Sequence, residues 1–154
     1  MLTMMSAGDE QFDIIKLLAA AAVNLDHGNA DYTTLSFAVE QGNALLVQAL
    51  LDPAADPDVK APNGGASLPN SGSDSGILKT LLDAGADPNV TNEYEETAVF
   101  TVIEYGSIDD LQALIDAGAN LNHKAENGQS PVGRADSLRK LEMKELLERN
   151  GGTG

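Results

Sequence analysis

The side chains best suited to metal or acid-base chemistry are few and stand far apart in the chain. The sequence has no cysteine and two histidines, His27 in NLDHGN and His123 in NLNHKA. The two histidines follow similar turns of a repeating pattern, and several repeats at roughly 10 Å each separate them. A zinc site needs ligands that meet at one point. We therefore interpret both histidines as polar loop residues and expect neither a metal nor a cofactor.

Other motifs with catalytic or ligand-binding potential are incomplete. Glu93, Glu95 and Glu96 lack the alternating Asp/Asn residues, the central Gly and the trailing Glu of a calcium loop. The glycine-rich stretch 63–76 has no GK[ST] ending, so it is not a phosphate-binding loop. Asp109-Asp110 precedes an expected helix, where the helix dipole favours carboxylates. Without a nucleophile, a base or a pocket, the sequence predicts a protein that is not an enzyme.

Two-residue apolar steps, most of them Leu-Leu, recur along the chain and indicate how it is organised. They begin at Leu17, Leu50, Leu81, Leu114 and Leu146. Their intervals are 33, 31, 33 and 32 residues. A period near 33 is typical of stacked structural repeats. Similar turns follow three of the steps, namely DPAADPD at 52–58, DAGADPN at 83–89 and DAGANLN at 116–122.

Each repeat is predicted to contain two helices. Apolar residues within 35–39 and within 99–103 recur at i, i+3 and i+4, which is the spacing of a helix with one apolar face. Gly42 and Gly106 are predicted to end these first helices, because the position after a helix end often has a positive φ. A second helix around each leucine step follows. The residues predicted to end these helices are Asp56-Pro57, Asp87-Pro88, Gly85 and Gly118.

These segments carry a resemblance to a known family. Residues 33–42, TTLSFAVEQG, and 97–106, TAVFTVIEYG, stand in the same phase before their leucine steps. With the GADPN-like turns they resemble the ankyrin repeat family over roughly residues 2–150. The resemblance implies an all-α, ankyrin-type helical repeat solenoid with projecting β-turn fingers, and an elongated stack that binds other proteins. We expect a single domain, 1–154, with repeats at about 1–27, 28–60, 61–91, 92–124 and 125–152.

The third repeat is predicted to be irregular. Leu68 to Leu81 spans 13 positions, whereas Leu35 to Leu50 spans 15. Its stretch 63–76 is rich in residues that disfavour helix interiors, so its first helix is in doubt, and Ser73 or Asp74 is expected to cap the second. The repeat is either a notch that admits a partner or a unit in tolerated decay.

The two ends of the chain also depart from the pattern. Leu2, Met4 and Met5 have no preceding repeat to cover them, which indicates either a trimmed chain or an edge that something else covers. At the other end, residues 137–152 are predicted to form one final helix with a charged outer face. Ser137 is expected to cap its start and Gly151 to close it.

Charge restricts the partners. The chain has 9 Lys and Arg against 24 Asp and Glu, a formal net charge of −15. Such a body is a poor ligand for nucleic acid, whereas its negative field would speed encounter with a basic protein. The alternative is that the charge serves solubility alone. No stretch of 18 apolar residues and no leader-like start is present, so we expect a cytoplasmic protein without membrane contact, and export with a removed leader stays open.

The family resemblance places binding residues at the finger tips and at the exposed ends of the first helices, along the concave side of the stack. The predicted partner-binding residues are Asn29, Asp31, Tyr32, Glu40, Gln41, Pro62, Asn63, Glu93, Tyr94, Glu96, Glu104, Tyr105, Glu126 and Asn127. They include all three tyrosines of the chain. Tyrosine is enriched among interface anchors. Tyr94 and Tyr105, with acids beside them, suit a Lys or Arg of a partner, unless they only pack on the next finger.

Three functional hypotheses follow. The first is a protein-protein interaction module that binds a basic partner through its concave acidic face. The second is an adaptor or structural fragment whose N-terminal edge docks on other repeats, another domain or a second copy. The third is an acidic inhibitor or immunity protein for a basic toxin or nuclease. We expect a monomer or weak self-association through the N-terminal edge.

Overall fold

The computed structural model describes residues 33–51, 56–60, 65–71 and 74–154. The predictions about His27 and about the edge formed by Leu2, Met4 and Met5 lie outside these residues, so the adaptor hypothesis stays a prediction. Within the described ranges the chain forms eight helices and no strand. The helices are α2 (Thr34–Glu40), α3 (Ala44–Leu51), α4 (Ser67–Asn70), α5 (Ser75–Asp83), α6 (Ala98–Tyr105), α7 (Ile108–Asp116), α8 (Pro131–Ser137) and α9 (Leu141–Arg149).

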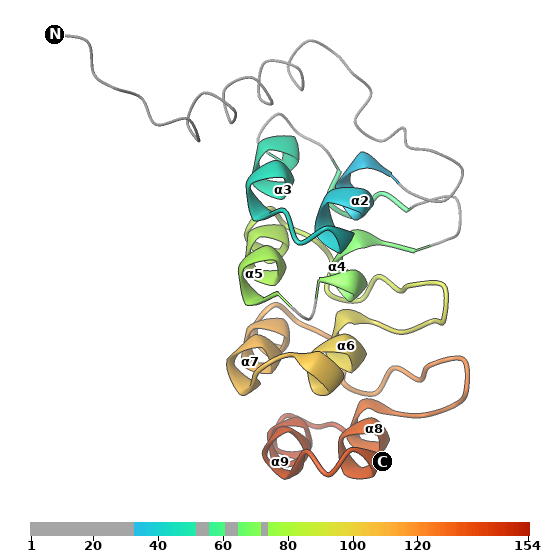
Figure 1. Ribbon diagram of the computed structural model, residues 1–154. Coiled ribbons are helices and arrows are strands. Elements are labelled where there is room, and N and C mark those ends of the chain that lie inside the picture. The colour runs from blue at the N-terminus through green and yellow to red at the C-terminus, as the bar shows by residue number, and fades with distance from the viewer. Residues whose placement is uncertain (1–32, 52–55, 61–64, 72–73) are drawn as a thin grey trace, which may run out of the picture.

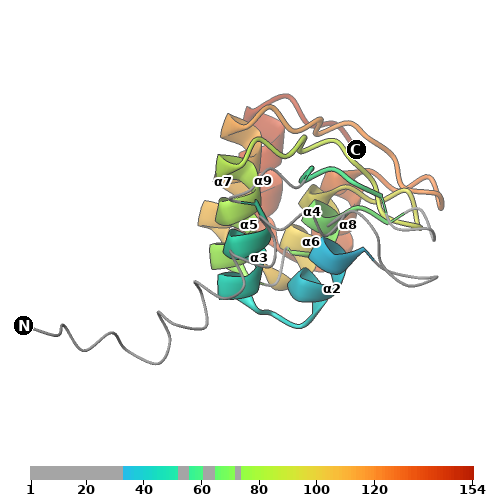
Figure 2. The same cartoon turned by 90° about the horizontal axis from the view of Figure 1, so that it is seen from above.

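The helices stand in two columns (Figure 1). The first column contains α2, α4, α6 and α8, the second contains α3, α5, α7 and α9, and each helix packs on the next one of its column. The loops 84–97 and 117–130, which we call fingers, project past the first column, as the view from above shows (Figure 2). The predicted all-α repeat solenoid with projecting fingers is confirmed. The division into five repeats stays a prediction, because the first of them lies in 1–32.

One apolar core runs through the stack. The residues of the predicted apolar stripes are buried in α2 and α6, and the leucine steps point inward from the second column. Leu50, Leu81, Leu114 and Leu147 are almost or completely inaccessible. Each helix pair thus has apolar faces toward both neighbours, which explains why such units are stable only when stacked.

Left-handed glycines end the second helices as the sequence predicted. Gly85 and Gly118 both have φ 89°, and Gly151, which was expected to close the last helix, has φ 92°. After α5 the amide of Ala86 donates to the carbonyl of Leu81 at 3.0 Å, a bond of the Schellman motif that glycine makes accessible at this position. These turns set the direction in which each finger leaves the stack.

The first helices end in two ways. Gly42 follows α2 with the predicted positive φ, 65°. Gly106 also ends its helix as predicted, as the C-cap of α6, but its φ of −90° and ψ of −172° are extended backbone instead of a positive φ. The chain therefore passes straight from α6 to Ser107, which caps α7.

The predicted final helix is α9, but it begins at Leu141, so the prediction that Ser137 caps its start is wrong. Ser137 is the last residue of α8, and its hydroxyl donates to the carbonyl of Arg134 at 2.8 Å. Arg139 then adopts a φ of 57°, and the amide of Lys140 donates to the carbonyl of Ala135 at 2.9 Å. The turn corresponds to the one at Gly42, with arginine in the place of glycine. A non-glycine residue in this conformation gave no signal in the sequence.

The third repeat keeps a first helix, but α4 makes only one turn. The N-caps of α4 and α5 are Ala66 and Asp74, eight positions apart, whereas Thr97 and Ser107, the N-caps of α6 and α7, are ten positions apart. The two missing residues therefore belong to the end of the first helix and the turn after it. Asp74 caps α5, as one of the two predicted candidates, by accepting from the amides of residues 76 and 77 at 2.9 and 3.0 Å.

Candidate functional site

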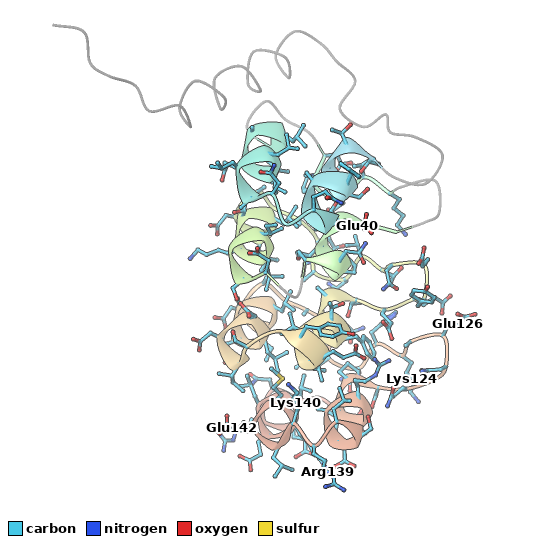
Figure 3. The ribbon with its side chains drawn as sticks, viewed as in Figure 1. Glu40, Lys124, Glu126, Arg139, Lys140 and Glu142 are labelled. Atoms are coloured by element: carbon cyan, nitrogen blue, oxygen red, sulfur yellow. The ribbon has the colours of Figure 1, made fainter. Side chains whose placement is uncertain are left out.

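Nine of the fourteen predicted partner-binding residues lie in the described part of the chain. Asn29, Asp31, Tyr32, Pro62 and Asn63 lie outside it. The other nine come from the end of α2, from the two fingers and from the end of α6. Figure 3 labels two of them, Glu40 below α2 and Glu126 at the tip of the last finger, both on the side of the first column. We call this surface, bounded by the fingers and the first helices, the inner face.

The backbone turns at the tips of the two fingers are alike, and in the finger 117–130 the amide of Ala125 donates to the carbonyl of Gln129 at 3.1 Å. In the finger 84–97, Asn92 donates its amide to the carbonyl of Glu96 at 2.9 Å, and its side-chain oxygen accepts from the amide of Tyr94 at 2.9 Å. Glu95 has a φ of 55° at the turn, where Gly128 has 78° in the next finger. Because left-handed backbone strains a residue with a Cβ, a carboxylate at this tip is held at an energetic cost.

His123 joins the two fingers. Its Nε2 lies 2.7 Å from the carbonyl oxygen of Glu95, a contact that requires the proton on Nε2. The amide of Glu126 also donates to the carbonyl of Tyr94, at 3.3 Å. His123 is thus a polar finger residue, in agreement with the sequence interpretation, and it aligns one finger tip on the next.

Three side chains at the finger roots connect successive repeats. Asp58, Asn89 and Asn122 accept through their side-chain oxygens from backbone amides of the following repeat: Asp87 at 3.0 Å, Asn120 at 2.7 Å and Thr153 at 2.8 Å. The two asparagines also donate to the carbonyls of Gly118 at 3.4 Å and Gly151 at 3.0 Å. We call these three residues the root bridges. Their role was not predicted from the sequence, although the Asp or Asn that ends each of the three similar turns was a usable signal.

Asp58 differs from the other root bridges because it carries a charge. Burial raises the pKa of its carboxyl group, the hydrogen bond from the Asp87 amide acts in the opposite direction, and the negative charges of Asp56 and Asp87 raise the pKa further. The net result is a pKa above the ordinary value. The ionised form is therefore less favourable here than in an unfolded chain.

Arg134 of α8 occupies the inner face and was missed by the sequence analysis. Its guanidinium binds Glu96 at 2.6 Å through Nη2 and Glu104 through Nη1, and its Nε donates to Gln129 at 2.7 Å. The guanidinium carbon lies 5.5 Å from the centroid of the Phe100 ring. Two of the acids expected to meet a partner are therefore paired within the chain, because an arginine on the next repeat reaches both.

The two described tyrosines of the inner face are open to solvent. Tyr94 is 59% exposed and Tyr105 is 69% exposed. Hydrogen bonding to Glu93, and then its charge, raises the pKa of Tyr94, and Glu104 acts on the pKa of Tyr105 in the same way. Each phenol thus has a carboxylate beside it, and most of each ring surface is available for contact.

Between α2 and α6 the inner face contains a groove of about 500 Å³. Its walls come from four parts of the chain: the end of α2, the short α4 with the residues after it, the finger 84–97, and α6. The residues that line it include Glu40, Asn70, Glu93, Tyr94, Thr101 and Tyr105. The described lining contains acids and no Lys or Arg.

Of the acidic pair Asp109-Asp110 at the start of α7, Asp110 has a structural role. It is part of the capping box of the helix, which confirms the capping interpretation for this residue. The carboxylate of Asp110 accepts from the amide and hydroxyl of Ser107 at 2.8 and 2.6 Å and from the hydroxyl of Ser75 at 2.8 Å. Burial acts to raise its pKa, but these hydrogen bonds outweigh burial and lower it. The bond to Ser75 also ties α7 to α5.

The geometry defines no metal or membrane site in the part of the chain that the structure describes. No three His, Asp or Glu side chains there are grouped so as to hold a metal ion. None of the helices in these ranges has the length and apolar character needed to cross a membrane.

Comparison with known proteins agrees with the helical repeat architecture. The chain is 45% identical over 53 residues to a putative ankyrin repeat protein of Acanthamoeba polyphaga mimivirus, a match that covers 32% of the chain and 33% of that protein. It is 28% identical over 180 aligned positions to an ankyrin repeat and KH domain-containing protein of Caenorhabditis elegans, covering 94% of the chain and 7% of that protein. No protein-family model matches.

A third relative is an ankyrin repeat-containing protein of Schizosaccharomyces pombe, 30% identical over 56 residues, which are 36% of the chain and 27% of that protein. The chain thus spans about a third or less of the length of these relatives. The stacked helix pairs with projecting fingers define a helical repeat protein. The three matches are all to ankyrin repeat proteins, and they support the resemblance of the chain to that family.

Proposed function

We propose that the chain is a non-enzymatic protein-protein interaction module that binds a basic partner through its inner face. The likeness to ankyrin repeat proteins supports the general class. The observation that carries the finer proposal is the exposure of Tyr94 and Tyr105 on a surface whose surrounding side chains are acidic. Rigid aromatic side chains with a polar tip provide large contact area at low entropic cost.

The acids would act mainly on the rate of encounter. The net charge of −15 produces a long-range field, and the exposed side chains of Glu40, Glu93 and Glu126 contribute to it at the inner face. Complementary charge raises association rates and is screened by salt, while buried anchors control dissociation. Glu96 and Glu104 contribute less to this field, because Arg134 neutralises part of their charge.

Charge reversal tests the electrostatic part of the proposal. A partner is first captured from native lysate with the wild-type chain, and capture is repeated with a Tyr94→Ala/Tyr105→Ala variant. Association of the purified partner is then measured at several salt concentrations for a Glu40→Lys/Glu93→Lys/Glu126→Lys variant. We expect a lower association rate with a flatter salt dependence.

The matched control is Asp83→Lys/Asp116→Lys/Glu148→Lys, which changes the net charge equally at exposed C-terminal ends of α5, α7 and α9. Lysine is favourable there because of the helix dipole, so the fold is preserved. The proposal is wrong if both triple variants slow association equally, or if the tyrosine variant captures the partner as well as the wild type.

A further inference from the structure

The groove on the inner face exists because the third repeat is short. A regular first helix has seven or eight residues, as α2 and α6 do, whereas α4 has four. The carbonyl of Pro69 in α4 accepts from the hydroxyl of Thr101 in α6 at 2.6 Å, which keeps the neighbouring helices in register. The missing residues therefore leave a hollow between the ends of α2 and α6, and the stack does not close over it.

The neighbouring repeat shows that the inner face can hold an arginine side chain against acids and an aromatic ring. Arg134 stands four positions after Ser130, the N-cap of α8, and its guanidinium lies between carboxylates and an aromatic ring. The residue four positions after Thr97, the N-cap of α6, is Thr101. Its short side chain lines the groove and leaves the corresponding space one repeat away open. One repeat thus supplies its own arginine and the adjacent repeat does not.

We infer that the groove takes an arginine side chain from an extended segment of the partner protein. This inference rests on the proposed function and names the chemistry of its central contact. Glu40 and Glu93 supply negative charge from opposite walls, and Tyr94 and Tyr105 supply aromatic surface for a planar cation. The volume of about 500 Å³ lies within the roughly 300–1,000 Å³ of ligand sites.

A short peptide is the appropriate probe, because a single side chain is the proposed occupant. The pentapeptide acetyl-Gly-Gly-Arg-Gly-Gly-amide is titrated into the full chain, and backbone amide shifts are followed by NMR. The control peptide carries citrulline, which has the shape of arginine without its charge. We expect saturable shifts at groove residues such as Gly42, Asn70 and Tyr105 for the arginine peptide, and binding weaker by roughly tenfold or more for the citrulline peptide.

Filling the groove from within is the sharper variant. Thr101→Arg repeats the arrangement of Arg134 and is expected to weaken peptide binding by roughly tenfold or more, since the new side chain takes the same space. The matched control is Ala117→Arg, which adds the same charge at the exposed C-cap of α7 in the second column, away from the groove, and is expected to leave binding within about twofold. Circular dichroism verifies that both variants are folded. If Thr101→Arg does not fold, Tyr94→Ala/Tyr105→Ala decides instead, because both rings are exposed.

The outcomes separate this inference from the proposed function. Equal binding of both peptides, or arginine-dependent shifts spread over the whole inner face, would overturn the groove as an arginine site. In that case a deca-arginine peptide tests the basic-partner proposal by itself. The proposal stands if this peptide binds the wild-type chain and associates more slowly with the Glu40→Lys/Glu93→Lys/Glu126→Lys variant. Failure of deca-arginine to bind at all would contradict both.

Discussion

The helix pairs α4–α5 and α6–α7 occupy successive places in the stack but differ in their first helices. α4 has four residues and α6 has eight, whereas α5 and α7 both have nine. The loss in α4 does not propagate, since α3, α5 and α7 pack in sequence and the root bridges Asp58 and Asn89 connect the fingers on either side. The second column and the finger roots therefore maintain the register, and the first column tolerates a deletion that creates a groove.

The largest expected effects come from truncating buried side chains in the two first helices. Phe100→Ala in α6 should lower the free energy of unfolding by about 3–5 kcal/mol, and Leu68→Ala in α4 by about 2–3 kcal/mol, since both side chains are fully buried. Urea unfolding followed by circular dichroism measures both. A cost below about 1 kcal/mol for Leu68→Ala would show that α4 contributes little packing, and would favour a decayed unit over a functional notch.

Removing the carboxylate that links α5 to α7 should have a smaller effect. Asp110→Ala is expected to cost about 1–2 kcal/mol, because it removes the carboxylate half of the capping box with Ser107 and the bond to Ser75. The exposed Asp109→Ala is the control, with a change of at most about 0.5 kcal/mol.

The pH dependence of the stability difference between the wild type and Asp110→Ala gives an independent check. Because the pKa of Asp110 is lowered in the folded chain, its contribution is complete above the unfolded value of about 3.9 and is lost as the pH falls through the folded pKa. The difference between wild type and Asp110→Ala should therefore shrink in acid. A difference that stays constant from pH 7 to the acid limit of folding would contradict this assignment.

Replacing left-handed non-glycine residues should stabilise the stack by about 0.5–1 kcal/mol each. Arg139→Gly relieves the turn between α8 and α9, and Glu95→Gly relieves the finger tip, where Gly128 already serves in the next finger. Thermal unfolding measures both, and Gly42→Ala is the reverse control, expected to be destabilising. Unchanged or lower stability in Arg139→Gly would mean that its side chain makes contacts that outweigh the strain.

The smallest effect is expected at the root bridges. At pH 7 Asp58→Asn should stabilise the chain by a few tenths of a kcal/mol, since the raised pKa means that stability from this group falls as pH rises from about 3.9 through the folded value. The reciprocal Asn89→Asp should destabilise the regular repeat by a similar amount. Differential scanning calorimetry at pH 7 and at pH 4 measures the stability of both variants. If Asp58→Asn and Asn89→Asp shift the unfolding temperature in the same direction at pH 7, Asp58 and Asn89 do not play equivalent roles.

Much of the fold was predictable, because its determinants are local and periodic. The leucine steps and the i, i+3, i+4 stripes located the helix pairs, and the turn glycines Gly85 and Gly118 marked the ends of second helices. The split between α8 and α9 was not predictable in this way. Leu138 and Leu141 continue an apolar pattern, yet they are 44% and 66% exposed.

The inner face was predictable in outline only. The exposed tyrosines follow from their position relative to the repeat, but the pairing of Glu96 and Glu104 with Arg134 joins residues 38 and 30 positions apart. Whether such long side chains meet depends on the tilt between α6 and α8, and spacing along a chain contains no information about tilt. The groove was likewise beyond reach, because it results from the helix end that two missing residues remove.

The root bridges also determine how the stack should respond to mechanical load. They join residues 29 or 31 positions apart, so tension applied at the ends of the described repeats is carried from one helix pair to the next in series. Rupture of one bridge exposes its helix pair without disturbing distant ones. Extension should therefore proceed in nearly equal steps of roughly 100 Å, the contour length of one repeat, which would make the chain act as a stepwise spring.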